Sequence, residues 1–313
     1  MLVERKAVKY DDRVSKYWPE FGAHGKEALT IAELLSHQAG LPGYTLPTTL
    51  HEFLDTEVAA ARLAAQEPLW PPGKACGYHG LSLGPIVSVL FKRIAGRSAR
   101  QFVAEEVAAP FKLGLSIGLE PEQYAEVAEV VRPEEGLDLS NFYRVDGAVF
   151  MGKQANPNLS AAQKAAMNPQ MDVRYANMPE WRAADVPGAN GFGNAHSVAE
   201  FYALVLGHPR NGKRLASREI IAEATRVRIE GLDQVKNVQA RWAAGFAVNE
   251  GLYGPNPSTF FHGGWGGSAS FGDPIADVSF SYLPNRMGEL AERDPRRRGL
   301  VDAVFDSVRK LQG

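Results

Sequence analysis

The last quarter of the chain constrains the fold most, because its sequence pattern differs from everything before it. Up to about residue 237, apolar residues recur at helical spacing between Gly- and Pro-rich loops. Short strand-like segments separated by Gly, Asn and Pro turns then follow at 242–249, 259–264, 268–271 and 278–283. A final amphipathic helix is expected after Asp294, with Pro295 at its first position. Helices, then an antiparallel meander and a terminal helix predict an α+β fold rather than a doubly wound sheet.

Capping signals indicate where several of the early helices begin. Thr30 and Glu33 form a capping box, and Ser197 and Glu200 form a second one before an apolar run. Further helices are expected over 48–67, 81–94 and 98–108. The stretch 115–185 is rich in Glu, Asn, Pro and Met, and we expect loops and short helices over a pocket there.

Composition excludes several classes of function. The 313 residues carry 34 Lys and Arg against 36 Asp and Glu, and a net charge of −2 gives no reason to expect nucleic acid as a partner. A single cysteine, Cys76, excludes an internal disulfide and a thiolate-based metal site. The seven histidines include no His-Glu-x-x-His or closely spaced pair, so neither a catalytic metal nor another cofactor is expected. No apolar stretch reaches the roughly 18 residues of a membrane helix, and the first residues lack a signal peptide, so we expect a cytoplasmic protein without membrane contact.

Four segments, in this order along the chain, carry a family resemblance. They are Leu34-Leu-Ser-His-Gln-Ala-Gly-Leu41, Trp70-Pro-Pro-Gly73 followed by Gly77-Tyr-His-Gly80, the run 197–206, and Phe261-His-Gly-Gly264 continuing to Asn285. Together they resemble the class C β-lactamase and penicillin-binding-protein-like serine hydrolases. Gly254-Pro-Asn-Pro257 before a His-x-Gly strand is similar to the esterase-like branch of that family. The resemblance implies a β-lactamase/transpeptidase-like fold in a single domain, with a helical lobe at about 31–237 and an α/β lobe formed by 1–30 and 238–313.

The resemblance also implies roles for individual residues. Tyr78 takes the position of the tyrosine that relays a proton between nucleophile and leaving group, which requires a nearby cation to stabilise its phenolate. His262, Gly263 and Gly264 take the places of a Lys-Thr-Gly motif, so His262 is the second candidate catalytic residue. The backbone N–H of Trp265 would then be one oxyanion donor, beside the nucleophile's own amide.

The nucleophile of the family is the serine of a Ser-x-x-Lys motif, in which hydroxyl and amine share one face of a helix. Here the only such motif is Ser307-Val-Arg-Lys310, close to the C-terminus, where it is a coincidence of an amphipathic helix. Met1 to Arg5 is similar to the end of the nucleophile helix, so we expect the nucleophile, and the first strands of the sheet, before Met1. A chain without those strands would expose a sheet edge and could form a homodimer through it.

The substrate prediction depends on what the motifs lack. A histidine, with an ordinary pKa of about 6.5, is mostly neutral at pH 7, and Gly263 has no hydroxyl to help hold a substrate carboxylate. Gly80 replaces the asparagine that would bind an acylamino side chain. These residues favour simple carboxylic esters over penicillins, with hydrolysis through an acyl-enzyme.

Two alternatives stay open. Gly80-Leu-Ser82-Leu-Gly84 matches the nucleophile elbow of an α/β hydrolase, although the prolines and glycines of 71–77 cannot form the buried strand that an elbow needs. The other alternative is a non-catalytic binding protein that keeps the pocket without the nucleophile.

Overall fold

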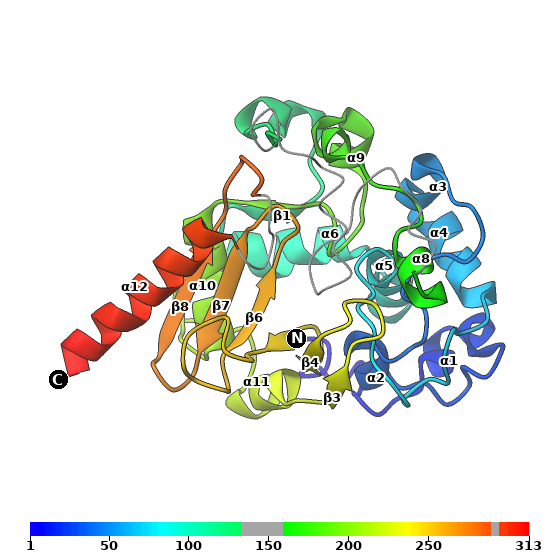
Figure 1. The fold of residues 1–313 in the computed structure, drawn as a ribbon, viewed down its shortest axis with the longest axis horizontal. Helices are drawn as coiled ribbons and strands as arrows, with labels where there is room; N and C mark the ends of the chain where they lie inside the picture. Colours follow the sequence, from blue (N-terminus) through cyan, green and yellow to red (C-terminus); the bar gives the residue numbers. More distant parts are fainter. Residues whose placement is uncertain (133–158, 289–293, 313) are drawn as a thin grey trace.

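The computed structural model describes residues 1–132, 159–288 and 294–312, and its helices lie beside a main antiparallel sheet (Figure 1). Helices dominate the first two thirds of the chain, the strands of the main sheet follow, and a long helix ends it. The α+β class predicted from the sequence is therefore confirmed. Among the described helices, none is both long and apolar enough to cross a bilayer.

The helical elements before the sheet are mostly short, and η marks 3-10 turns except for η2, which is a π-helical turn. They are α1 (Val14–Tyr17), η1 (Pro19–Gly22), α2 (Ile31–Leu35), α3 (Leu50–Leu54), α4 (Thr56–Ala65), α5 (Leu83–Ala95), α6 (Ala99–Phe102), η2 (Val103–Ala108), α7 (Ala109–Phe111), η3 (Pro121–Glu126), α8 (Ala161–Ala166), η5 (Val173–Asn177), α9 (Pro179–Ala183), α10 (Ala195–Val205) and α11 (Arg218–Thr225). A short two-stranded sheet pairs β1 (Leu115–Ile117) with β2 (Gly191–Gly193). Of the stretch 115–185, residues 133–158 lie outside the described residues.

Capping explains several helix boundaries and corrects others. Thr30 forms the predicted capping box with Glu33 at the start of α2. The single helix predicted over 48–67 is wrong, because Asp55 ends α3 and its side chain caps α4. The helix predicted to begin at Ser197 starts earlier, because the side chain of Asn194 accepts the hydrogen bond of the Ser197 amide and caps α10.

The main sheet is a meander in which every strand pairs with its neighbour in sequence. Its six strands, in spatial order, are β3 (Ile229–Leu232), β4 (Gln239–Trp242), β5 (Ala247–Val248), β6 (Phe260–Gly263), β7 (Ala269–Asp273) and β8 (Val278–Tyr282). The strand predicted over 242–249 is instead the end of β4, a turn closed by a hydrogen bond from Ala243 N–H to Phe246 O, and β5. β3 was not predicted.

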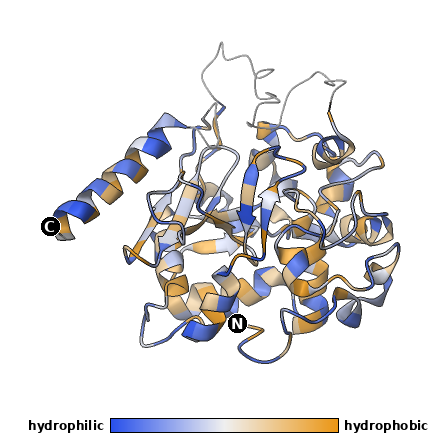
Figure 2. Ribbon diagram, turned by 60° about the horizontal axis from the view of Figure 1, so that its bottom comes forward, coloured by the Kyte–Doolittle hydropathy of each residue, from blue (hydrophilic) through white to orange (hydrophobic). Residues whose placement is uncertain are grey.

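Neighbouring residues of β6 face opposite sides of the sheet, and each side packs against a different helix. Phe260 packs with Tyr202 and Val205 of α10. On the other side, Phe261 packs with Tyr253 and Phe271, and Val301 and Phe305 of α12 (Pro295–Gln312) complete that cluster. Figure 1 shows α12 running outward from the sheet edge, and Figure 2 shows polar and apolar residues alternating along it. Asp294 caps α12 as predicted, since its Oδ1 accepts the hydrogen bond of the Arg296 amide at 2.9 Å.

The largest buried cluster lies among the helices. It joins the connector after Met1 to α4 and α5, and its most enclosed members include Val14, Phe21, Leu34, Leu63 and Ile86. The division into lobes at 30/31 and 237/238 stays a prediction; the packing places Val14 and Phe21 in the helical cluster, and the sheet begins at Ile229.

Candidate active site

Tyr78 lies in the loop before α5, and a carboxylate distant in sequence fixes its backbone. The Tyr78 N–H donates to Oδ1 of Asp233 at 3.1 Å. Asp233 is fully buried, and the same oxygen accepts the amides of Val235 and Lys236, each at 2.9 Å. Its Oδ2 accepts the indole N–H of Trp242 at 3.2 Å. One carboxylate therefore joins the Tyr78 loop to the β3–β4 turn and to β4.

The Tyr78 ring is enclosed by aromatic side chains from three segments. It stacks on Trp242, with ring centroids 5.5 Å apart and planes 6° from parallel. His37 meets it edge-on at 5.1 Å and meets Trp242 at 4.3 Å. The His262 ring of β6 lies 6.1 Å from the Tyr78 ring. The fold thus brings together the predicted catalytic pair, Tyr78 and His262, and the histidine of the Leu-Leu-Ser-His segment.

His37 and His79 join the Leu34–Leu41 segment to the Gly77–Gly80 segment through hydrogen bonds, and both rings are held neutral. His37 Nδ1 accepts the backbone N–H of His79 at 3.2 Å. His79 Nε2 accepts the Leu41 N–H at 3.1 Å, and its Nδ1 donates to Gly77 O at 2.5 Å. Burial lowers the pKa of His79 to about 4. Burial is also the main reason that the pKa of His37 lies well below its ordinary value, with further electrostatic contributions from His79, His262 and Lys236. Both rings accept backbone amides only while they are unprotonated.

Gly80 is placed directly against the phenol that it follows by two residues. A Cβ at position 80 would lie 2.7 Å from Cε1 of Tyr78, closer than real Cβ contacts. The position has no room for the asparagine side chain that the family motif carries there, unless the Tyr78 ring moves.

Ser82 is not placed to act as a nucleophile. Its side chain is fully buried, and Oγ donates a hydrogen bond to Leu41 O. It precedes the first residue of α5, with no described strand leading into it. The nucleophile elbow is therefore excluded in this structure, for the reason that the Pro- and Gly-rich approach suggested.

The residues in the places of the Lys-Thr-Gly motif occupy the β6–β7 hairpin. His262 pairs with Ser270, and its exposed ring donates through Nδ1 to Gly263 O at 2.9 Å. Gly263 pairs with Ala269, and a Cβ there would lie 2.9 Å from the Tyr253 hydroxyl. The Gly264 N–H donates to Ser268 O at 2.8 Å and closes the turn that carries Trp265. The oxyanion role of Trp265 stays a prediction.

Asp233, Lys236, Trp242 and the placement of His37 were not predicted as parts of the site. His37 was visible within the family segment, and an Asp in a turn commonly accepts the backbone amide two residues further on, as Asp233 does from Val235. Nothing local in the sequence links Asp233 to Tyr78, 155 residues away. Among the described residues, no group of three or more His, Cys, Asp or Glu is placed to hold a metal ion.

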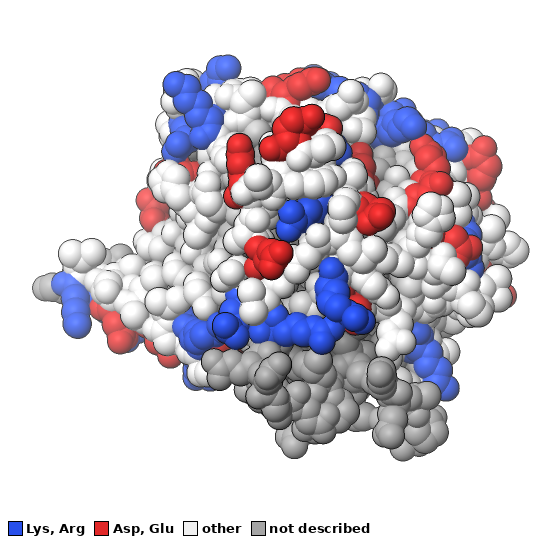
Figure 3. Space-filling view, turned by 90° about the horizontal axis from the view of Figure 1, so that it is seen from above, with Lys and Arg blue, Asp and Glu red and all other residues white. Residues whose placement is uncertain are grey.

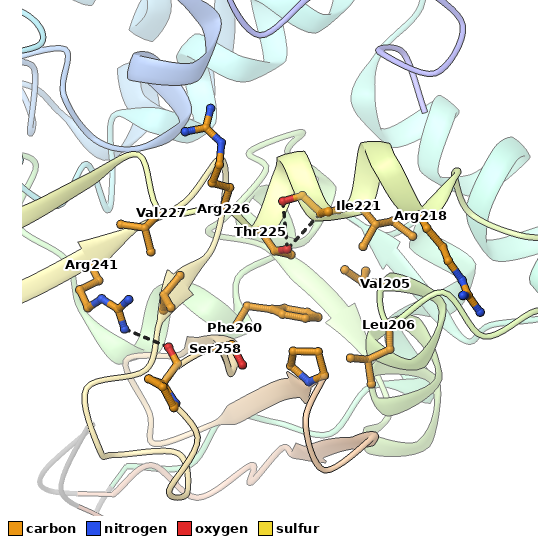
Figure 4. Close-up of a pocket in the computed structure, with 14 residues that line it drawn as sticks. Val205, Leu206, Arg218, Ile221, Thr225, Arg226, Val227, Arg241, Ser258 and Phe260 are labelled. Atoms are coloured by element: carbon orange, nitrogen blue, oxygen red, sulfur yellow. Dashed lines mark hydrogen bonds between the residues drawn. The ribbon is translucent and has the colours of Figure 1, made fainter.

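A cavity of about 680 Å³ lies away from these residues, between α10, α11 and strands β4 to β6 (Figure 4). None of the predicted site residues lines it; its wall combines apolar side chains such as Val205 and Phe260 with Arg218, Arg226 and Arg241. Arg241 already donates to the carbonyls of Asn249 and Pro257. On the face seen in Figure 3, Lys and Arg are interspersed with Asp and Glu.

Comparison with known proteins identifies the relatives of this arrangement. A family model described as Beta-lactamase matches residues 1–305. The Esterase/beta-lactamase LipL of Mycobacterium tuberculosis is 32% identical over 296 residues, which cover 91% of this chain and 65% of that protein. The chain thus spans just under two thirds of the length of this relative.

Two solved structures share both sequence and fold with the chain. A family VIII carboxylesterase is 36% identical, with a TM-score of 0.87, over 97% of this chain and 78% of that one. A penicillin-binding protein homologue from Caulobacter crescentus is 34% identical, with a TM-score of 0.83, over 98% of this chain and 78% of that one. The resemblance inferred from the motifs is confirmed.

Proposed function

Since this chain belongs to the beta-lactamase family, we propose that it forms the larger part of a serine hydrolase that cleaves carboxylic esters through an acyl-enzyme. The observation that carries the proposal is the enclosure of Tyr78 by Trp242 and His37, with His262 on the facing strand. Two relatives whose names include esterase or carboxylesterase support the reaction class.

Tyr78 acts in this proposal as the proton relay. The serine oxygen attacks the ester carbonyl while its proton passes to the Tyr78 phenolate; Tyr78 then returns that proton to the departing alkoxide. Water deacylates the enzyme by the same route in reverse. The N–H groups of the nucleophile and of Trp265 would bind the oxyanion.

The nucleophile in this proposal belongs to a Ser-x-x-Lys helix that precedes Met1. Arg5 N–H donates to Met1 O at 3.0 Å, and Lys6 follows with φ 58°, which is how the final turn of a helix commonly ends. The relatives are longer than this chain, which is consistent with a further segment. Ser82, buried and bonded to Leu41 O, offers no substitute.

Esters are proposed over β-lactams because the groups that hold a penicillin are replaced. Gly80 has no side-chain amide to bind an acylamino group, and the Tyr78 ring fills the space beside it. His262 is a weaker cation than lysine, and Gly263 has no hydroxyl.

The test uses the protein expressed from its gene with the sequence that precedes Met1, and in parallel residues 1–313 alone. We expect the longer protein to hydrolyse short-chain p-nitrophenyl esters, to turn over nitrocefin poorly, and to be labelled by a fluorophosphonate on a serine outside 1–313. Tyr78→Phe should remove most of the esterase activity, whereas the matched variant Tyr175→Phe should retain it. Residues 1–313 alone should form no acyl-enzyme.

Full activity of Tyr78→Phe in the longer protein would disprove the assigned relay. A longer protein that binds esters without hydrolysing them or reacting with the probe would favour the non-catalytic binding protein instead.

A further inference from the structure

A lysine from the β3–β4 turn lies beside the proposed relay. Lys236 Nζ is 5.8 Å from the ring centroid of Tyr78 and 5.8 Å from that of Trp242, on which Tyr78 stacks. The ammonium is therefore equidistant from both rings of the stacked pair. Cations at this distance interact favourably with aromatic rings, and more strongly with a ring that carries a negative charge.

The placement of Lys236 is coupled to that of Tyr78 through Asp233. One oxygen of this buried carboxylate accepts the backbone N–H groups of both Tyr78 and Lys236, at 3.1 and 2.9 Å, while the other oxygen holds the indole of Trp242. The backbones of Tyr78 and Lys236 and the indole of Trp242 thus share one anchor. A surface lysine near an aromatic ring by chance would have no such connection.

Among the described residues, four other ionisable groups near Tyr78 help to define what Lys236 contributes. His37 and His79 are neutral above the acidic range, because burial lowers the pKa of each. Asp233, next to the Tyr78 backbone, is an anion and opposes a second negative charge nearby. The His262 ring faces the Tyr78 ring from β6, with the ring centroids 6.1 Å apart. The charge of Lys236 reaches this cluster, since it contributes to the lowered pKa of His37.

We infer that Lys236 is a positioning residue whose ammonium stabilises the ionised phenol of Tyr78. The catalytic meaning of this inference rests on the proposed function, because only a proton relay needs the phenolate. The stabilisation of the Tyr78 phenolate by Lys236 involves residues of this chain alone, and measuring it requires no substrate.

The test titrates Tyr78 directly. Protein labelled with [¹³Cζ]tyrosine is followed by NMR from pH 7 to 11, and the Tyr78 resonance is the one absent from Tyr78→Phe. We expect Lys236→Met to raise the midpoint of Tyr78 by about half to one pH unit, the effect of removing one partly solvated charge at this distance. Lys236→Arg should keep the wild-type midpoint, and Lys213→Met, which removes an exposed lysine on the loop after α10, should also leave it unchanged.

An unchanged midpoint in Lys236→Met, or an equal rise in Lys236→Arg, would overturn the inference. If Lys236→Met does not show a cooperative thermal transition, Lys236→Gln is titrated under the same criterion. In the longer protein, Lys236→Met should also move the acidic limb of the pH profile of kcat/KM upward by the same interval. A shifted NMR midpoint without any ester hydrolysis would uphold the inference on Lys236 and reject the proposed function, so the two fail separately.

Discussion

Tyr78 and His262 face each other across the candidate site, but the protein holds them in different ways. The Tyr78 loop is joined to the rest of the molecule by buried hydrogen bonds through Asp233, His37 and His79. The His262 ring stands exposed at the end of a hairpin and donates to its own neighbour's carbonyl. One side of the site is fixed by buried hydrogen bonds between distant segments, whereas on the other side the His262 ring stands at the surface of its strand.

Because of this difference, we expect the two sides of the site to tolerate amino-acid substitutions differently. A proton relay requires its phenol to be held within hydrogen-bond distance of the reacting atoms, and buried networks provide that constraint. A substrate-facing strand end can change residue without cost to the core. Substitutions of the buried hydrogen-bonding groups on the Tyr78 side should therefore lower the free energy of unfolding, while those of the exposed His262 ring should leave it nearly unchanged.

Asp233→Ala should have the largest effect. It leaves the N–H groups of Tyr78, Val235 and Lys236 and the indole of Trp242 without their acceptor, and we expect a loss of about 3–5 kcal/mol in the free energy of unfolding. Urea denaturation followed by fluorescence measures it. Asp233→Asn is the matched variant and should lose less, because Oδ1 still accepts three backbone amides. A loss below about 1 kcal/mol for Asp233→Ala would show that the Tyr78 side is not held as described.

The second-largest effect is expected from lowering the pH, which should destabilise the Tyr78 side of the site through His79. His79 has its pKa lowered to about 4 in the folded protein and lies near 6.5 when unfolded, so the unfolded state binds more protons between these values. Its contribution is complete above pH 6.5 and declines by about 3 kcal/mol as the pH falls to 4. Because lowered carboxyl pKa values such as that of Asp12 also weaken the protein in acid, the difference between wild type and His79→Gln isolates the histidine. His24→Gln, at an exposed position, should retain the full pH dependence; a parallel decline in His79→Gln would contradict the assignment.

Ser82→Ala should produce a moderate effect. It removes the hydrogen bond to Leu41 O within a buried contact, which predicts a loss of about 1 kcal/mol in the free energy of unfolding by urea. Ester hydrolysis by the longer protein should continue at the wild-type rate. Loss of fluorophosphonate labelling in Ser82→Ala would instead restore the nucleophile elbow.

His262→Gln should change stability least, by less than about 0.5 kcal/mol, because the ring is exposed. Its effect should be seen in KM across a series of esters rather than in the melting temperature. A drop in melting temperature as large as that of Ser82→Ala would show that both sides of the site are built into the core, and the comparison would fail.

Local signals in the sequence predicted the class of the fold and the start of its long terminal helix. They failed where a competing cap or a group distant in sequence determines the boundary of an element or the contacts of a residue. Asn194 starts α10 ahead of the apparent box at Ser197, and β3 carries a glycine in its interior, which weakens the pattern of a strand. In the site, motif order located Tyr78 and His262, but the partnership of Tyr78 with Asp233 and Lys236 is created by the tertiary fold and has no local signature.

The close approach at Gly80 has a consequence for how such a site could change over generations. A single Gly80→Asn exchange, which would supply the amide of the family motif, first drives a Cβ into the Tyr78 ring at 2.7 Å. That ring is stacked on Trp242, so the exchange would impair the relay before the new amide could bind anything. A lineage could gain the amide only after Trp242 or its surroundings had made room. The order of substitutions, and not merely their number, would separate this site from one that accepts acylamino substrates.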